Sequence, residues 1–314
     1  MHSTTGKQSK IRKPATGKFP PPNSHTQYGV KRESVPYFPM LPKGHFPLPN
    51  FAVRSTLFKS TAPNRHKFEK KENGELSWTE NRGLDGYQHF YYGELLTVFH
   101  ARVFGHVLAL CWPEMASGGR VYFRLYKLLQ MMGSKTGGSN YASLSRALET
   151  LASCELSPAG GKDISGPLLN YGYDEAQKKY YIDLPKSIRN HFLVGDYTLL
   201  CSKDMKDLRG NTTKLLYAFF SSHDLALENG LTAEFLQKNI VGSSSKKSVF
   251  LRLMPYVVKQ LTRAGVLVHA EIIDGKLIYS LPKKPKSVKQ ALRKKFRSFG
   301  LSKSNTRSSI RPPP

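Results

Sequence analysis

The chain has 314 residues, enough for about two domains, and its hydrophobic content of 39% supports buried cores. Its formal charge is +26, of which +7 lies in residues 1–50, +11 in residues 282–314 and +8 between them. This excess predicts a polyanionic partner, and charge alone admits both nucleic acid and an anionic membrane surface. The sequence contains no signal-peptide core and no apolar run of about 18 residues, so we expect a cytoplasmic protein.

The two ends of the chain differ in composition from the middle. Residues 1–50 contain nine prolines, a density that opposes helices and sheet ladders and predicts an extended basic arm. Residues 282–314 hold eleven basic residues and no acidic one, which predicts a second mobile basic arm. Between the arms, aromatic residues around a Gly-Leu-Asp-Gly turn predict a hairpin over 75–92. Apolar residues at helical spacing over 95–112 then predict a helix buried on one face.

One order of elements occurs twice in the middle of the chain. A helix, a Gly-containing turn, a second helix and a β-hairpin are predicted over 120–184, and again over 235–281. Gly133 of the first unit corresponds to Gly242 of the second, and Leu151 corresponds to Leu261. Two helices followed by a hairpin describe a winged helix. The sequence therefore predicts an α+β fold of tandem winged-helix domains with extended basic N- and C-terminal arms, the domains covering 51–190 and 191–281.

The second helix of the second unit carries the features expected of a DNA-recognition helix. Ser244 or Ser245 is predicted to cap it, and Pro255 is predicted to kink it or limit its regular part. The core side is predicted to hold Val249, Leu253, Val257, Leu261 and Ala264. The residues predicted to contact DNA are Lys246, Lys247, Arg252, Lys259 and Arg263 on this helix and Lys276 in the hairpin. The alternative is a solvated basic face on an ordinary packing helix.

The corresponding helix of the first unit is a poor match for DNA. Its only basic residue is Arg146, and Glu149 lies close to it in sequence. This difference predicts that the second unit binds DNA and the first unit makes protein contacts. The alternative is that the two units only pack against each other.

Several segments resemble the TrfA family of plasmid replication initiators. They are "LPNFAVRSTLF", "FRLYKLLQMMGSKTGG", "FLVGDYTLL" and "LLYAFFSSHDLAL", in the family's order and spacing. The resemblance implies a protein that binds direct repeats (iterons) of double-stranded DNA at an origin and opens adjacent DNA. It further implies recruitment of the host initiator and replicative helicase, and an equilibrium between a homodimer and an active monomer. Within "FSSHD", we expect His223 to bond the last carbonyls of its helix rather than DNA.

Motifs for enzyme chemistry are missing from the sequence. The Lys and Gly residues of "MGSKTGGS" lack the spacing of a phosphate-binding loop, and no two histidines are separated by one residue as metal-dependent DNA-nicking enzymes require. Three scattered cysteines predict neither a disulfide framework nor a zinc site. We therefore expect no catalytic residues, no metal and no cofactor. The alternatives to an initiator are a winged-helix transcriptional regulator that binds a promoter operator, and an architectural or membrane-tethering protein acting through its arms.

Overall fold

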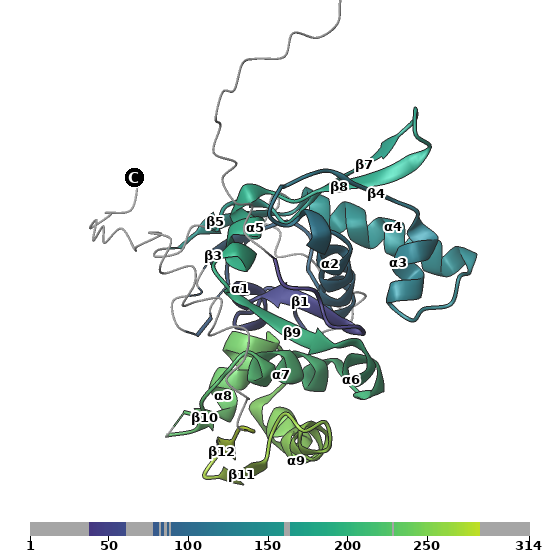
Figure 1. Cartoon of the computed structure of the whole chain (residues 1–314). Helices are drawn as coiled ribbons and strands as arrows, with labels where there is room; N and C mark the ends of the chain where they lie inside the picture. Colours follow the sequence, from purple (N-terminus) through teal and green to yellow (C-terminus); the bar gives the residue numbers. More distant parts are fainter. Residues whose placement is uncertain are drawn as a thin grey trace, which may run out of the picture. The chain divides into compact units, whose positions relative to one another are not determined.

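The computed structural model describes residues 38–60, 78–81, 83–84, 87, 89–159, 164–227 and 229–282 (Figure 1). All of these belong to one compact unit. The predicted domain boundary between residues 190 and 191 therefore stays a prediction. Most of the two predicted arms lies outside the described residues.

The first winged-helix unit combines three helices with a three-stranded sheet. Its elements are α2 (Val98–Leu110), β4 (Val121–Phe123), α3 (Leu125–Met131), α4 (Gly138–Ser153), β7 (Asn170–Asp174) and β8 (Lys179–Asp183). The strand order is β4-β8-β7, and both pairings are antiparallel. The hairpin β7–β8 follows α4 as the sequence predicts.

The second winged-helix unit repeats this topology. Its elements are α7 (Asn211–Ser221), β10 (Leu231–Thr232), α8 (Ala233–Phe235) with a π-helical turn (Leu236–Val241), α9 (Lys247–Arg263), β11 (His269–Ile273) and β12 (Lys276–Ser280). The strand order, β10-β12-β11, matches that of the first unit. Gly133 and Gly242 both have left-handed backbones, with φ of 64° and 58°. Gly133 lies between α3 and α4, and Gly242 lies between the π-helical turn and α9. The predicted tandem winged-helix fold is confirmed.

A four-stranded antiparallel sheet interrupts the first unit. It contains β2 (Thr79–Asn81), β3 (His89–Tyr92), β5 (Glu155–Pro158) and β6 (Gly166–Pro167), in the order β2-β3-β5-β6. The pairing of β2 with β3 confirms the hairpin predicted over 75–92. β5 and β6, which lie between α4 and β7, were not predicted from the sequence.

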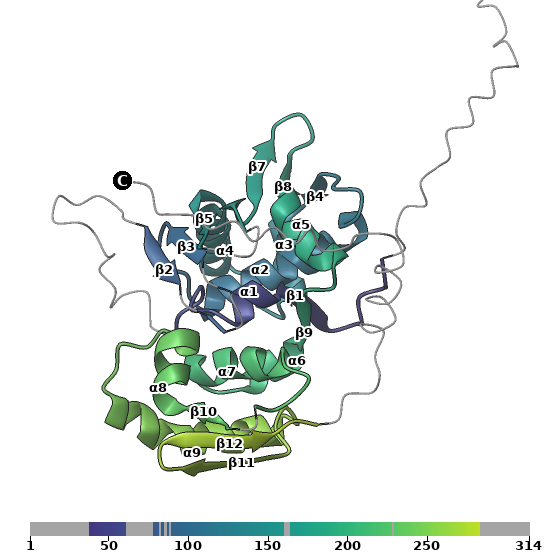
Figure 2. The ribbon, with the colours of Figure 1, turned by 90° about the vertical axis from the view of Figure 1, so that its left-hand side faces the viewer.

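A two-stranded sheet connects the segment before the first unit with the segment before the second. β1 (His45–Pro49) pairs in antiparallel register with β9 (Tyr197–Cys201), and the short helix α1 (Asn50–Val53) contacts both β1 and α7 (Figure 2). The remaining helices are α5 (Lys186–Leu193), a 3₁₀ turn (Trp112–Glu114) and α6 (Ser202–Asp207).

The predicted arm boundary at residue 50 is wrong, because residues 45–50 are part of the fold. Phe46, Pro47, Leu48 and Pro49 are all buried, so both faces of β1 are covered by the fold. A two-stranded sheet has only edge strands, where proline is tolerated. High proline density is therefore compatible with a short edge strand.

Helix α2 lies at the centre of the core rather than along its edge. Val103, Phe104, Val107 and Leu108 are fully buried, and the helix contacts β1, α4 and α7. Burial therefore extends around most of the helix, whereas the sequence predicts one buried face. Phe99, one of the apolar residues at helical spacing within 95–112, is predicted to be buried but is 37% exposed.

Candidate nucleic-acid interface

Helix α9 separates an apolar stripe from a basic surface. Its fully buried side chains are Phe250, Met254, Val257 and Leu261. An α-helix turns about 100° per residue, so Arg252, Lys259 and Arg263 lie on the side opposite this stripe. All three are exposed, and the helix contains no acidic residue. The arrangement presents a line of positive charge that acidic side chains of the helix do not offset.

The predicted core side of α9 is wrong over its first half. Val249 is 44% exposed and Leu253 is 38% exposed, while Phe250 and Met254 occupy the core. The predicted spacing of four residues from Val249 to Leu261 drifts by about 40° per step, whereas the observed spacing of four, three and four keeps one straight stripe. Val257 and Leu261 are buried as predicted, and Ala264 follows the helix as its half-buried C-cap.

The start of α9 also differs from the prediction. Lys246 occupies the N-cap position and no side chain caps the helix. Ser245 instead fixes the preceding turn, because the Gln237 amide nitrogen donates to its carbonyl at 2.5 Å. Gln237 is buried in the π-helical turn, so this bond ties the turn to the start of the recognition helix.

Lys246 and Lys247 are both exposed at this end of the helix. The Lys247 ammonium nitrogen lies 3.8 Å from a carboxylate oxygen of Glu234, and Lys238 donates to the other oxygen at 2.6 Å. The Lys238 hydrogen bond is the main cause of a lowered pKa of Glu234, so the carboxylate is ionised at neutral pH. One acidic residue thus offsets part of the positive charge beside the first turn.

Pro255 does not end the regular part of α9, which continues to Arg263. Pro255 is exposed, so its ring lies away from the buried stripe. The expectation that the proline limits the helix is therefore wrong. The full helix is available as a recognition surface, including Lys259 and Arg263.

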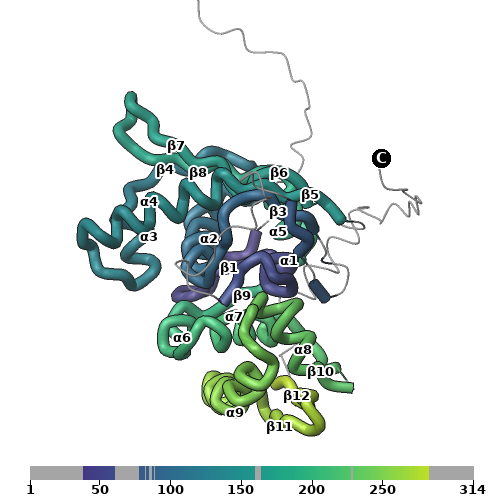
Figure 3. The backbone as a smooth tube through the Cα atoms, turned by 180° about the vertical axis from the view of Figure 1, so that it is seen from behind, coloured from purple at the N-terminus to yellow at the C-terminus, as the bar shows by residue number. Residues whose placement is uncertain are grey.

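The hairpin β11–β12 lies beside α9 (Figure 3). Asp274 and Gly275 both have left-handed backbones, with φ of 49° and 74°, which is the geometry of a tight I′ turn. Lys276 follows the turn directly, pairs with Ile273 and is exposed. The predicted wing is confirmed, and its basic residue lies at the tip.

A groove of about 530 Å³ between α6 and the second half of α9 extends the basic surface. Its basic lining residues are Lys203 and Arg209, together with Lys259 and Arg263 of α9, and Asp204 and Asp207 also line it. The Gln260 side chain holds the loop after α6 by accepting from the Arg209 backbone N–H at 2.7 Å. Lys203 and Arg209 could not be predicted to join this surface, because their segment lies far from α9 along the chain.

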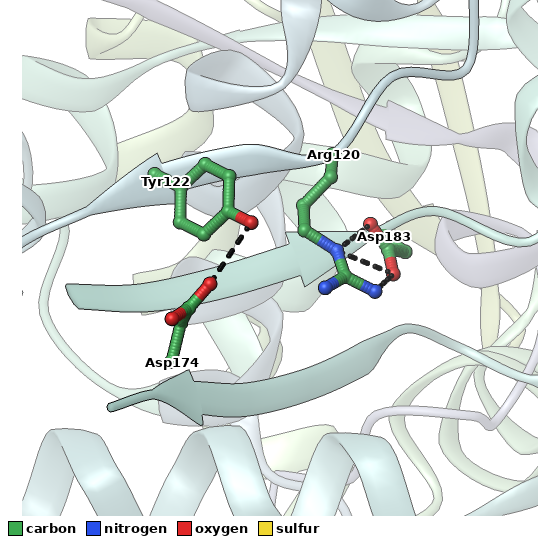
Figure 4. Close-up of polar contacts among 4 residues, drawn as sticks. All are labelled: Arg120, Tyr122, Asp174 and Asp183. Atoms are coloured by element: carbon green, nitrogen blue, oxygen red, sulfur yellow. Dashed lines mark hydrogen bonds and ion pairs between the residues drawn. The ribbon is translucent and has the colours of Figure 1, made fainter. Parts of the chain in front are cut away.

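The equivalent helix of the first unit carries no net charge. Helix α4 buries Leu144, Ala147, Leu148 and Leu151 and exposes Arg146 and Glu149. On the adjacent sheet, Arg120 donates to both carboxylate oxygens of Asp183 at 2.9–3.2 Å and Tyr122 donates to Asp174 at 3.1 Å (Figure 4). Asp183 therefore neutralises Arg120, whereas Arg124, Lys178 and Lys179 line a hollow of about 360 Å³ beside this sheet with no acidic lining residue.

Two segments that carry the TrfA resemblance contact each other. Arg54, from "LPNFAVRSTLF", donates its Nε to the Ser222 hydroxyl at 3.0 Å and its Nη2 to the Ser222 carbonyl. Ser222 belongs to "FSSHD", where the His223 ring contacts the Phe219 carbonyl at 2.8 Å through Nδ1. His223 is buried, which agrees with its expected structural role at the end of α7.

Other kinds of site have little support in the described part of the chain. There, no three His, Cys, Asp or Glu side chains group closely enough to hold a metal ion. No helix within the same ranges has the length and apolar character needed to cross a membrane. Cys111 and Cys154 are buried, Cys201 is half-buried, and all three are free thiols.

Comparison with known proteins adds the following. No family model matches the chain and no curated protein matches it, so the TrfA resemblance stays a prediction. Domains 2 and 3 of RctB match in two structures at 12% identity, with TM-scores of 0.49 and 0.44, over 74% of this chain and 96% and 98% of those chains. The Pi initiator protein in complex with iteron DNA matches with a TM-score of 0.41 at 9% identity, over 58% of this chain and 92% of that chain.

Proposed function

We propose that the chain is a non-enzymatic initiator of plasmid replication that binds direct repeats of double-stranded DNA through α9. The observation that carries this proposal is the line of Arg252, Lys259 and Arg263, which lies opposite the buried stripe of α9 and beside a wing with Lys276 at its tip. In helix-turn-helix proteins the second helix of the motif enters the major groove, while basic side chains around it bind phosphates. No metal or cofactor is needed for this role.

The TrfA resemblance favours an initiator over a transcriptional regulator. On this proposal the protein acts in the cytoplasm, binds iterons at the origin, promotes opening of adjacent DNA and recruits the host initiator and replicative helicase. The first winged-helix unit supports the protein contacts, including a dimer in equilibrium with a monomer. Its weakly charged α4 face and its internally paired Arg120 suit a protein partner better than a polyanion.

The test is a gel shift and footprint of the full chain on DNA flanking its own gene, at ~150 mM salt with excess competitor DNA. The triple variant Arg252→Ala/Lys259→Ala/Arg263→Ala removes the basic line of α9. A charge-matched control, Lys127→Ala/Lys135→Ala/Arg146→Ala, removes three exposed basic residues from the first unit. We expect regularly spaced protection that the α9 variant loses and the control retains.

Other patterns would contradict the proposal. Protection of a single palindrome over the promoter would assign the chain to the transcriptional regulators. Unspaced binding that both variants retain would place the interaction in the arms. Equal loss in both variants would mean that total charge, rather than α9, governs binding.

A further inference from the structure

Two exposed apolar side chains lie within the basic surface of α9. Val249 and Leu253 are 44% and 38% exposed and are four residues apart, so they occupy one side of the helix, one turn apart. Val249 follows Lys247 by two positions, and Leu253 directly follows Arg252. Neither side chain is needed for the core, because Phe250 and Met254 fill the buried stripe at this level.

Exposed apolar residues are ordinary when they are scattered singly. Here two of them share one side of the half of the helix that also carries Lys246, Lys247 and Arg252. A protein partner is disfavoured because the cores of protein interfaces are depleted of charged residues. The charge around this pair is complementary to DNA.

The major groove offers one apolar feature on its base edges, the C5-methyl group of thymine. We infer that Val249 and Leu253 contact thymine methyl groups and so determine part of the DNA sequence that α9 prefers. This inference rests on the proposed function, since it requires α9 to enter the major groove. Both residues precede Pro255, in the part of the recognition helix whose residues meet base edges in helix-turn-helix proteins.

The experiment begins with selection of a preferred sequence from a random pool of duplex DNA, using the full chain. Each thymine of the selected sequence is then replaced in turn by deoxyuridine, which removes only the methyl group. We expect binding to weaken about threefold to fivefold at one or two positions, the effect of removing one buried methyl group. Affinity is measured by fluorescence anisotropy at constant salt.

The variants Val249→Ala and Leu253→Ala then test which side chain meets which methyl group. Each is expected to weaken binding to the thymine duplex and to abolish the deoxyuridine effect at its own position, leaving the effect at the other position. Val194→Ala, at an exposed apolar position at the end of α5, is the matched control and should retain both effects. Both α9 residues are exposed, so the alanine variants are expected to fold, which circular dichroism verifies.

The outcomes separate this inference from the proposed function. If no preferred sequence emerges, the proposed function fails and the inference fails with it. If a preferred sequence emerges but no deoxyuridine effect depends on Val249 or Leu253, the inference is overturned while the proposed function stands. If the alanine variants change self-association in sedimentation and leave the deoxyuridine effects intact, the pair is a contact between copies and the inference is overturned.

Discussion

Arg54 lies in the segment that precedes the first winged-helix unit. Its side chain donates hydrogen bonds to Ser222, at the end of α7. Its guanidinium donates to both the hydroxyl and the carbonyl of Ser222 and lies 5.6 Å from the centre of the Tyr87 ring. Arg54→Lys keeps the charge but lacks the planar fork that reaches both acceptors. We expect it to lower the free energy of unfolding by about 1–3 kcal/mol, the value of a hydrogen bond to a charged group.

Urea unfolding of the purified chain measures this loss. Arg146→Lys, at an exposed position of α4, is the control and should leave the midpoint within error. Equal midpoints for the two variants would show that the Arg54 contact contributes nothing to stability.

Glu234 limits the positive charge beside the first turn of α9. It accepts a hydrogen bond from Lys238 and lies 3.8 Å from the Lys247 ammonium nitrogen. We expect Glu234→Gln to tighten binding to any duplex DNA and to steepen its salt dependence by up to about one unit, because Lys247 becomes more available to a phosphate. Anisotropy titrations over a series of salt concentrations measure both quantities.

The matched control is Glu149→Gln, which removes an exposed carboxylate from α4. If the two variants tighten binding equally, the effect reflects net charge and not the position of Glu234. If neither changes the salt slope, Lys247 does not meet a phosphate.

The packing of β1 against α2 depends on Gly105. A Cβ atom at this position would lie 2.2 Å from Cδ2 of Phe46, whose side chain is fully buried. Alanine in a helix is ordinarily favoured over glycine by about 1 kcal/mol. Here we expect Gly105→Ala to destabilise the protein by about 1–3 kcal/mol, because the ring must move in a filled core.

Thermal and urea unfolding measure the difference. Gly138→Ala is the control, since a Cβ atom there meets no heavy atom within 4 Å. We expect it to be neutral or slightly stabilising. Stabilisation by Gly105→Ala would contradict the close contact between β1 and α2.

The sequence predicts the elements of both winged-helix units well because their periodic patterns are local. The turn at Asp274 and Gly275, for example, follows from residue type alone. The same patterns do not settle which side of α9 is buried, because apolar residues stand at both 249 and 250 and at both 253 and 254. Only the packing partners choose between the two sets.

Long-range contacts mark the other limit of prediction. β1 is a strand only because β9, about 150 residues later, pairs with it. Lys203 and Arg209 line the same groove as Lys259 and Arg263 of α9. The Arg209 backbone N–H also donates a hydrogen bond to the Gln260 side chain. The basic residues of α9 could be identified from their types and spacing, but its groove partners could not.

The two winged-helix units differ in the charge that they expose. The second unit presents a recognition helix without acidic residues, whereas the first unit pairs Arg120 with Asp183 and exposes few cations on α4. The two units thus share a topology but differ in the charge of their second helices.

Two buried histidines, His89 and His106, and the half-buried His100 make the stability of the whole fold depend on pH. Burial lowers the pKa values of His89, His100 and His106 to about 4. In the unfolded chain these groups titrate near pH 6.5, so between pH 6.5 and pH 4 the unfolded state binds more protons than the folded state. The stability contributed by the neutral rings is thus fully present above pH 6.5 and is lost as the pH falls toward 4.

His106 tests this dependence because its surroundings are defined. Its Nδ1 lies 2.7 Å from the Arg102 carbonyl oxygen, and its Nε2 lies 3.3 Å from the hydroxyl of Ser202, the first residue of α6. His106→Gln removes one titrating group, so we expect the variant to be less stable than the unmodified chain at pH 7.5. That deficit should shrink by about 2–3 kcal/mol as the pH falls from 6.5 to 4.

Urea midpoints at several pH values give the stability profiles of the unmodified chain and of His106→Gln. The control is His269→Gln, which replaces an exposed histidine of β11. A constant deficit across the range would mean that His106 protonates equally in the folded and unfolded states. A deficit that shrinks below pH 6.5 ties acid sensitivity to the burial of α2, the helix that contacts β1, α4 and α7. Acid would then weaken the shared core of both units rather than one of them.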